Sequence, residues 1–231
     1  YGIVYNGEIY NYKKLAERLL SEGKVTAFRG TSDTEVLLEA FEAYGVEETI
    51  RECKGMFAIA LYDKQESSLT LLRDRIGEKP LYYGMVNGSF VFASDIGSIS
   101  VLDGFQNPVD TRVLDLYFVH GYIPAPYSIY QNIYKLEPGT ILKIKSPFNK
   151  WEMKKYWSVM EVARRGQDDP FKGTRQEAPV KGRHSRADGC RCSGRSVFVC
   201  RDRQQYRGSA YAVPSSGKGE ELYHWHEGRR L

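Results

Sequence analysis

Residues 56–62 read MFAIALY, an almost unbroken apolar run that ends at the charged pair Asp63-Lys64. An apolar run of this length without polar alternation is typical of a strand that is buried on both faces. Such a strand needs a layer of structure on each side of its sheet. The elements on either side of this run along the chain must supply those layers.

Two helices are predicted before this strand. Residues 12–22 carry leucines at helical spacing, and Gly23 follows them as a stop. A second helix is predicted to begin at Ser32, an N-cap residue, with Glu35 three positions on as its partner in a capping box. Its apolar face ends at Gly45. These two helices could form one covering layer.

Further strands are predicted on both sides of the helices. Residues 2–5 read as a short buried strand that ends at the polar turn 6–8. After the central run, strands are predicted at 68–73, 81–85, 89–93 and within 132–145, with a possible helix at 111–118. Helices followed by several strands, without βαβ alternation, predict an α+β fold with layered sheets.

The composition changes near residue 170. Residues 171–231 contain 13 basic and 6 acidic residues, whereas residues 1–170 contain 20 basic and 23 acidic residues. Both helical and strand periodicities vanish in this tail, where Arg, Gly, Ser and Cys crowd together. We predict a domain at 1–118, a linker at 119–170 and a disordered tail at 171–231. No apolar run reaches the length of a membrane helix.

The polar residues after the first strand are candidates for chemistry. Asn6 offers two amide donors, and Gly7 lets its backbone N–H approach a ligand without a Cβ in the way. Together they could stabilise an oxyanion. Asp33, at the start of the second helix, could pair with the α-ammonium of an amino acid. Each feature also has an ordinary structural explanation, a turn for Asn-Gly and a favourable helix dipole for Asp33.

An ordered series of motifs gives these residues a more specific meaning. The motifs are NGEIYNY (6–12), GTSDTE (30–35), GMFAIALYD (55–63), RDRIGEKPLYY (73–83), FASD (92–95), GYIPAP (121–126) and YW (156–157). This series resembles the class II glutamine amidotransferases, and among them the asparagine synthetases. The resemblance runs from Tyr1 to about Trp157.

The resemblance implies an N-terminal nucleophile-type fold, an αββα sandwich with two antiparallel sheets, here partial. In such enzymes an N-terminal Cys attacks the side-chain amide of glutamine and releases ammonia. The resemblance assigns Asn6 and Gly7 to the oxyanion hole. It assigns Glu8 and Asp33 to the backbone of glutamine, with Asp33 on the α-ammonium. A second domain would use ATP and Mg²⁺ to amidate aspartate to asparagine.

The resemblance also places a charged loop at the surface that faces the synthetase domain. This loop contains Arg73, Asp74, Arg75 and Lys79. A solvated charged hairpin is the alternative interpretation. None of these residues is assigned a catalytic role.

Two features depart from the family pattern. No Cys precedes Asn6, so we expect an N-terminally truncated fragment that is inactive as a glutaminase. Cys53 is expected to be a buried core thiol rather than a replacement nucleophile. The nucleotide-binding motif SGGxDSS, which should follow Tyr156-Trp157, is absent.

A frameshift is our hypothesis for the missing motif. With the reading shifted by one nucleotide, permitted codons from Ala187 to Gln205 spell QMAADVPVGVFLSAGIDSS, which resembles the QMIADVPLGAFLSGGVDSS of the family. The Cys190/Cys192 and His224/His226 pairs would then be accidental. Their spacing also differs from that of zinc ligands, so we expect no metal site.

Partners and alternatives follow from the same resemblance. L-glutamine is the expected ligand; aspartate, ATP and Mg²⁺ are expected only for the synthetase domain, and no cofactor for this fragment. We expect a cytoplasmic protein that binds neither nucleic acid nor membrane, and a homodimeric full-length form is left open. The alternatives are the glutaminase domain of another class II amidotransferase, or a non-catalytic glutamine-binding or interaction remnant.

Overall fold

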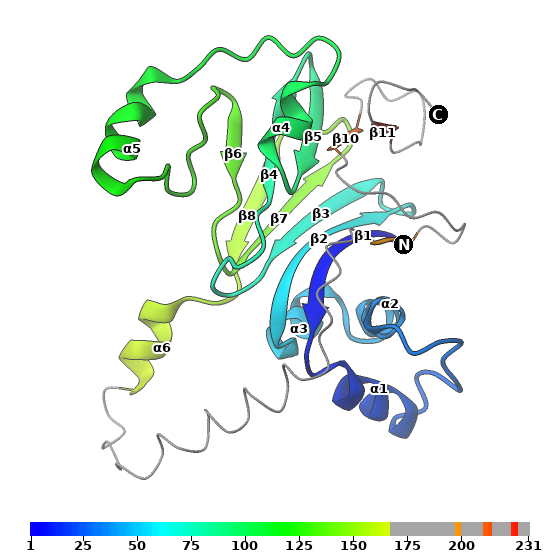
Figure 1. Ribbon diagram of the computed structural model, residues 1–231. Helices are drawn as coiled ribbons and strands as arrows, with labels where there is room; N and C mark the ends of the chain where they lie inside the picture. Colours follow the sequence, from blue (N-terminus) through cyan, green and yellow to red (C-terminus); the bar gives the residue numbers. More distant parts are fainter. Residues whose placement is uncertain (167–196, 200–209, 214–222, 226–231) are drawn as a thin grey trace.

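Two antiparallel sheets form the centre of the molecule (Figure 1). The computed structural model describes residues 1–166, 197–199, 210–213 and 223–225. The first sheet, in the order β8-β7-β3-β2-β1-β9, contains β1 (Gly2–Ile9), β2 (Gly55–Asp63), β3 (Ser68–Arg73), β7 (Thr140–Lys145), β8 (Trp151–Lys155) and β9 (Val197–Val199). The second sheet, in the order β11-β10-β5-β4-β6, contains β4 (Tyr82–Val86), β5 (Ser89–Ala93), β6 (Ile133–Lys135), β10 (Ala210–Val213) and β11 (Tyr223–Trp225).

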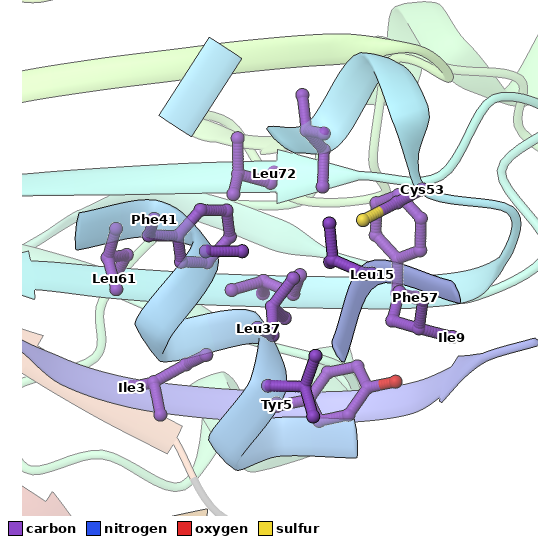
Figure 2. Packing of buried hydrophobic residues seen from close by; sticks show 14 of the residues in the cluster. Ile3, Tyr5, Ile9, Leu15, Leu37, Phe41, Cys53, Phe57, Leu61 and Leu72 are labelled. Carbon is purple, nitrogen blue, oxygen red and sulfur yellow. The ribbon is translucent and has the colours of Figure 1, made fainter. Parts of the chain in front are cut away.

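Helices cover the outer faces of both sheets. The helices are α1 (Tyr12–Ser21), α2 (Asp33–Tyr44), α3 (Val46–Glu52), α4 (Ile96–Ser100), the 3₁₀ helix η1 (Thr111–Val113), α5 (Leu114–His120) and α6 (Val159–Gly166). The first three pack on the outer face of the first sheet, and their side chains share one apolar cluster with it (Figure 2). A second cluster lies between the sheets, and a third joins α4 to the second sheet. The order of layers is therefore αββα, which confirms the predicted fold class.

Strand β2 is buried on both faces, as its apolar sequence predicts. Phe57, Ile59 and Leu61 belong to the cluster under the helices, whereas Ala58 and Ala60 belong to the cluster between the sheets. The helix-facing residues are the larger ones, and burial of each such side chain contributes roughly 1.5–3 kcal/mol. This strand lies between β1 and β3, so it fixes the position of β1.

The two predicted helices are present, with one corrected detail. Ser32 caps α2 by accepting a hydrogen bond from the Thr34 N–H at 3.2 Å. The predicted capping box is wrong, because the Glu35 carboxylate accepts from the N–H groups of Arg29 at 2.8 Å and Gly30 at 2.9 Å instead. Glu35 thus holds the loop before α2 in place. The short helix α3 was not predicted, since seven residues give little periodicity.

Residues 119–157 build part of the two sheets rather than an irregular linker. They supply β6 to the second sheet and β7 and β8 to the first. The strands predicted within 132–145 are present as β6 and β7, but the Pro-rich segment 123–126 interrupts both periodicities before them and suggests a linker.

Predictions for the tail fall mostly outside the described residues. The structure gives only β9, β10 and β11 there, and the predicted disorder of 171–231 and the frameshift stay predictions. Within the described part of the chain, no helix is long and apolar enough to cross a membrane.

Candidate functional site

The candidate residues Asn6, Gly7 and Glu8 lie inside β1 and not in a turn after it. The strand continues to Ile9, and all three residues pair with β2. The predicted bend is therefore wrong. Asn-Gly is a turn signal in isolation, but eight residues of β1 are paired along their length with the apolar strand β2, which overrides the local preference.

Gly7 is required where it lies. Its φ of +146° is one that side chains rarely adopt, and a Cβ at this position would be 2.0 Å from the Met56 carbonyl oxygen. Strands β1 and β2 therefore approach each other here in a way that only glycine permits. Any larger residue would push β1 away from the central strand.

The backbone N–H of Gly7 points away from β2. Phe57 of β2 faces Gly7. Its carbonyl oxygen accepts a hydrogen bond from the Asp74 N–H at 2.9 Å, and its N–H donates to Asp74 Oδ2 at 3.3 Å. Both backbone groups of Phe57 are therefore directed away from Gly7. Facing residues of an antiparallel ladder alternate between pairs that exchange hydrogen bonds and pairs that do not. Gly7 and Phe57 form a pair of the second kind, so the Gly7 N–H is directed to the outer edge of β1.

Asp33 lies at this same edge. Its Oδ2 accepts hydrogen bonds from the Ile9 N–H at 3.1 Å and from the Tyr5 hydroxyl at 2.8 Å. Ile9 is two residues beyond Gly7, so their N–H groups are spaced by about 7 Å along the edge. The structure thus places the Asp33 carboxylate and the Gly7 N–H at two ends of a short stretch of the outer edge of β1. Among the described residues, β9 pairs with Ile3–Tyr5 only.

Asn6 reaches the other sheet. Its Nδ2 donates a hydrogen bond to Ser94 Oγ at 3.1 Å, just after β5. Side chains alternate across a strand, so Asn6 and Glu8 project from the face of β1 that looks toward the second sheet, opposite Tyr5 and Ile9. Asp33 therefore approaches the edge of β1 from the helical layer, and Asn6 and Glu8 approach it from between the sheets.

Tyr5 is a site residue that the sequence did not reveal. Its side chain is 3% exposed within the cluster under the helices (Figure 2). Burial and the neighbouring Asp33 carboxylate raise the pKa of the Tyr5 phenol, so it stays protonated and can donate to Asp33 at neutral pH. The motif quoted above begins at Asn6, and an aromatic residue in a strand is ordinarily core.

Cys53 is a core thiol, as predicted. It is 1% exposed, lies among the apolar residues of the helical layer, and burial raises its pKa to about 12 (Figure 2). A thiol with this pKa contains almost no thiolate at neutral pH. It is therefore unsuited to nucleophilic attack.

The charged loop after β3 is not a solvated hairpin. Asp74 is 1% exposed, and its carboxylate accepts hydrogen bonds from five backbone N–H groups, those of Phe57, Ile76, Gly77, Glu78 and Lys79. Arg73 is also buried, which lowers its pKa, and it donates to the carbonyls of Gly77, Lys79 and Leu136. Arg73, the last residue of β3, and Asp74, the first residue of the loop, organise the fold, and the expectation that these two lie at the surface is wrong.

A separate cleft of about 470 Å³ lies next to this loop. Arg75, Pro138, Trp157 and Val159 are among the residues that line it, and none of the candidate residues on β1 does. In the described part of the chain there is no cluster of His, Cys, Asp or Glu able to hold a metal ion. The side chains of Cys190, Cys192, His224 and His226 lie outside the described residues.

Comparison with known proteins identifies the family of the chain. A family model described as "Glutamine amidotransferase domain" matches residues 1–157. A putative asparagine synthetase (glutamine-hydrolyzing) 2 of Methanocaldococcus jannaschii is 38% identical over 157 residues, which cover 67% of this chain and 29% of the relative. Asparagine synthetase (glutamine-hydrolyzing) 1 of Bacillus subtilis is 38% identical over 145 residues, 63% of this chain and 22% of the relative.

The chain spans less than a third of the length of these curated relatives. Among solved structures, a glutamine phosphoribosylpyrophosphate amidotransferase from B. subtilis, complexed with ADP and GMP, is similar with a TM-score of 0.46 and 22% identity. The match covers 68% of this chain and 29% of that one.

Proposed function

Because this chain belongs to the glutamine amidotransferase domain family, we propose that residues 1–157 bind L-glutamine along the outer edge of β1 and polarise its side-chain carboxamide for hydrolysis. One observation carries the proposal. The Asp33 carboxylate is hydrogen-bonded to Ile9 at the same strand edge toward which the Gly7 N–H points. The N–H groups of Gly7 and Ile9 are spaced by about 7 Å along this edge, and Asp33 lies at the Ile9 end.

The α-ammonium of glutamine would bind at Asp33. One carboxylate oxygen, Oδ2, already holds the Tyr5 hydroxyl and the Ile9 N–H, so the carboxylate is fixed in orientation. Its Oδ1 has a long contact of 3.5 Å with the Thr34 hydroxyl, which leaves capacity for a charged donor. Glu8, on the face of β1 that also carries Asn6, would contribute a second carboxylate for the ligand backbone.

The carboxamide oxygen of glutamine would bind at Asn6 Nδ2 and the Gly7 N–H. Nucleophilic attack converts this oxygen into an oxyanion, and both groups are donors on β1, which is paired with β2 along its length. Loss of one such donor typically lowers the rate by about 10²–10³. Cys53 is buried with a raised pKa, so we assign binding and polarisation, and not nucleophilic attack, to the described residues.

The wider activity is the second part of the proposal. Ammonia released from glutamine would amidate aspartate at the expense of ATP with Mg²⁺, in a cytoplasmic asparagine synthetase. Both relatives are named asparagine synthetases, and these names support aspartate as the acceptor of the ammonia. ATP, Mg²⁺ and aspartate would bind outside residues 1–157.

Calorimetric titration with L-glutamine tests the binding step. We expect wild type to bind L-glutamine and Asp33→Asn to bind it at least about tenfold more weakly, because a charged hydrogen bond contributes roughly 1.5–3 kcal/mol. Asp63→Asn is the matched control, since Asp63 caps a hairpin turn by accepting from Gln65 and Glu66. Equal affinities in wild type and Asp33→Asn would refute the proposed role of Asp33.

A further inference from the structure

We propose that Ser94 is a positioning residue that orients the Asn6 carboxamide toward the ligand. The inference rests on the proposed function, because it concerns the donor that would meet the glutamine carboxamide. Its basis is the hydrogen bond from Asn6 Nδ2 to Ser94 Oγ at 3.1 Å. The two residues are 88 positions apart in sequence; Asn6 belongs to β1 of the first sheet, and Ser94 directly follows β5 of the second sheet.

Ser94 is held on both sides by regular structure. The residue before it, Ala93, is the last residue of β5, is 2% exposed and pairs with Tyr82. The residue after it, Asp95, caps α4 by accepting from the Ser98 N–H at 3.0 Å. The Ser94 hydroxyl is therefore presented from a fixed point on the second sheet.

The chemistry of the Asn6 side chain makes such a fixed partner useful. An amide carries two N–H donors on Nδ2 and an acceptor on Oδ1, and rotation about χ2 exchanges their positions at little cost. When Ser94 accepts one N–H, the second N–H is available for the ligand. In the rotated state Oδ1 would face the carboxamide oxygen of glutamine, and two acceptors would repel. The Ser94 hydroxyl could also donate to Oδ1 in that state, so repulsion at the ligand favours the orientation seen in the structure, in which Nδ2 donates to Ser94. Ser94 fixes the position of the amide plane.

This arrangement makes the site depend on both sheets. Gly7 and Asp33 are positioned by the first sheet and its helices, whereas the Asn6 amide is aligned by Ser94, the residue that follows β5 of the second sheet. Residues 92–95 form the motif FASD, whose sequence alone indicates no role for them. The contact with Asn6 supplies one for its third residue.

Two measurements on the chain test the inference. In ¹⁵N-labelled protein the Asn6 side-chain amide signal is assigned by its loss in Asn6→Ala. In Ser94→Ala we expect this signal to shift and its protons to exchange faster with water, and the affinity for L-glutamine to fall roughly 2- to 10-fold through loss of one orienting hydrogen bond. Ser94→Thr keeps the hydroxyl and should retain both wild-type properties.

Ser100→Ala is the matched control. Ser100 lies on α4, and its hydroxyl donates to the Gly97 carbonyl and not to Asn6, so this variant should behave as wild type. The inference is overturned if Ser94→Ala leaves the Asn6 signal and the affinity unchanged, or if Ser94→Thr fails as Ser94→Ala does. If wild type itself binds no L-glutamine, the proposed function fails. The Asn6 amide signal then decides separately whether Ser94 orients it.

Discussion

Glycine at position 7 determines whether β1 can both pair with β2 and offer a donor at its outer edge. A Cβ there would be 2.0 Å from the Met56 carbonyl oxygen, and the φ of +146° is unfavourable for any other residue. Asn6 and Asp33 depend on partners far away in sequence, Ser94 and Tyr5 respectively. The residues of the candidate site could therefore be predicted from the sequence, whereas the hydrogen bonds that orient their side chains could not.

Gly7→Ala should lower the free energy of unfolding by about 3 kcal/mol, from backbone strain and overpacking together. Gly2→Ala is the matched control on the same strand, because its Cβ would make an ordinary van der Waals contact, 4.0 Å from Tyr62 Cβ. The control should change stability by less than about 1 kcal/mol. Urea denaturation measures the free energy of unfolding of both variants. Similar stabilities for the two variants would show that β1 and β2 do not approach as described.

At the scale of single elements, sequence patterns identified most strands and helices but misjudged two charged or polar segments. Asn6-Gly7-Glu8 reads as a turn because its residues are turn formers, yet they belong to β1. The charged loop after β3 reads as solvated, yet Asp74 is buried and collects five N–H groups. In both segments, hydrogen bonds to residues distant in sequence determine the structure. A single sequence does not show which backbone groups will form those hydrogen bonds.

Asp74→Ala should destabilise the chain by about 3 kcal/mol or more, because it leaves several buried N–H groups without an acceptor. Asp63→Ala removes a carboxylate that accepts from two N–H groups in a partly exposed turn, and we expect about 1 kcal/mol there. Thermal and urea unfolding of both variants provide the comparison. A loss for Asp74→Ala no larger than for Asp63→Ala would contradict the structural role assigned to this carboxylate.

At the scale of the whole molecule, the αββα order of layers follows from one sequence feature. Residues 56–62 are apolar on both faces, so their sheet must be covered twice, and the structure covers it with helices on one side and the second sheet on the other. The extent of the layered unit was harder to predict. The strands predicted within 132–145 are present as β6 and β7, but the assignment of 119–170 to a linker separated them from the domain to which they belong.

Truncation tests this extent directly. Residues 1–157 should unfold cooperatively and keep the affinity for L-glutamine of the whole chain. Residues 1–118 lack β7, the partner of β3, and β6, the partner of β4, and also the buried side chains of Leu136, Leu142 and Ile144. We expect no cooperative transition for this shorter piece, and a thermal midpoint equal to that of 1–157 would contradict the expectation.

The central claim is that glutamine binds along the outer edge of β1, between Gly7 and Asp33. Backbone amide chemical shifts, followed by ¹H–¹⁵N NMR while L-glutamine is added, test it most directly. We predict that the largest changes occur at Gly7 and Ile9 and disappear in Asp33→Asn. Changes confined to the cleft at Arg75 and Trp157, with Gly7 and Ile9 unmoved, would contradict it.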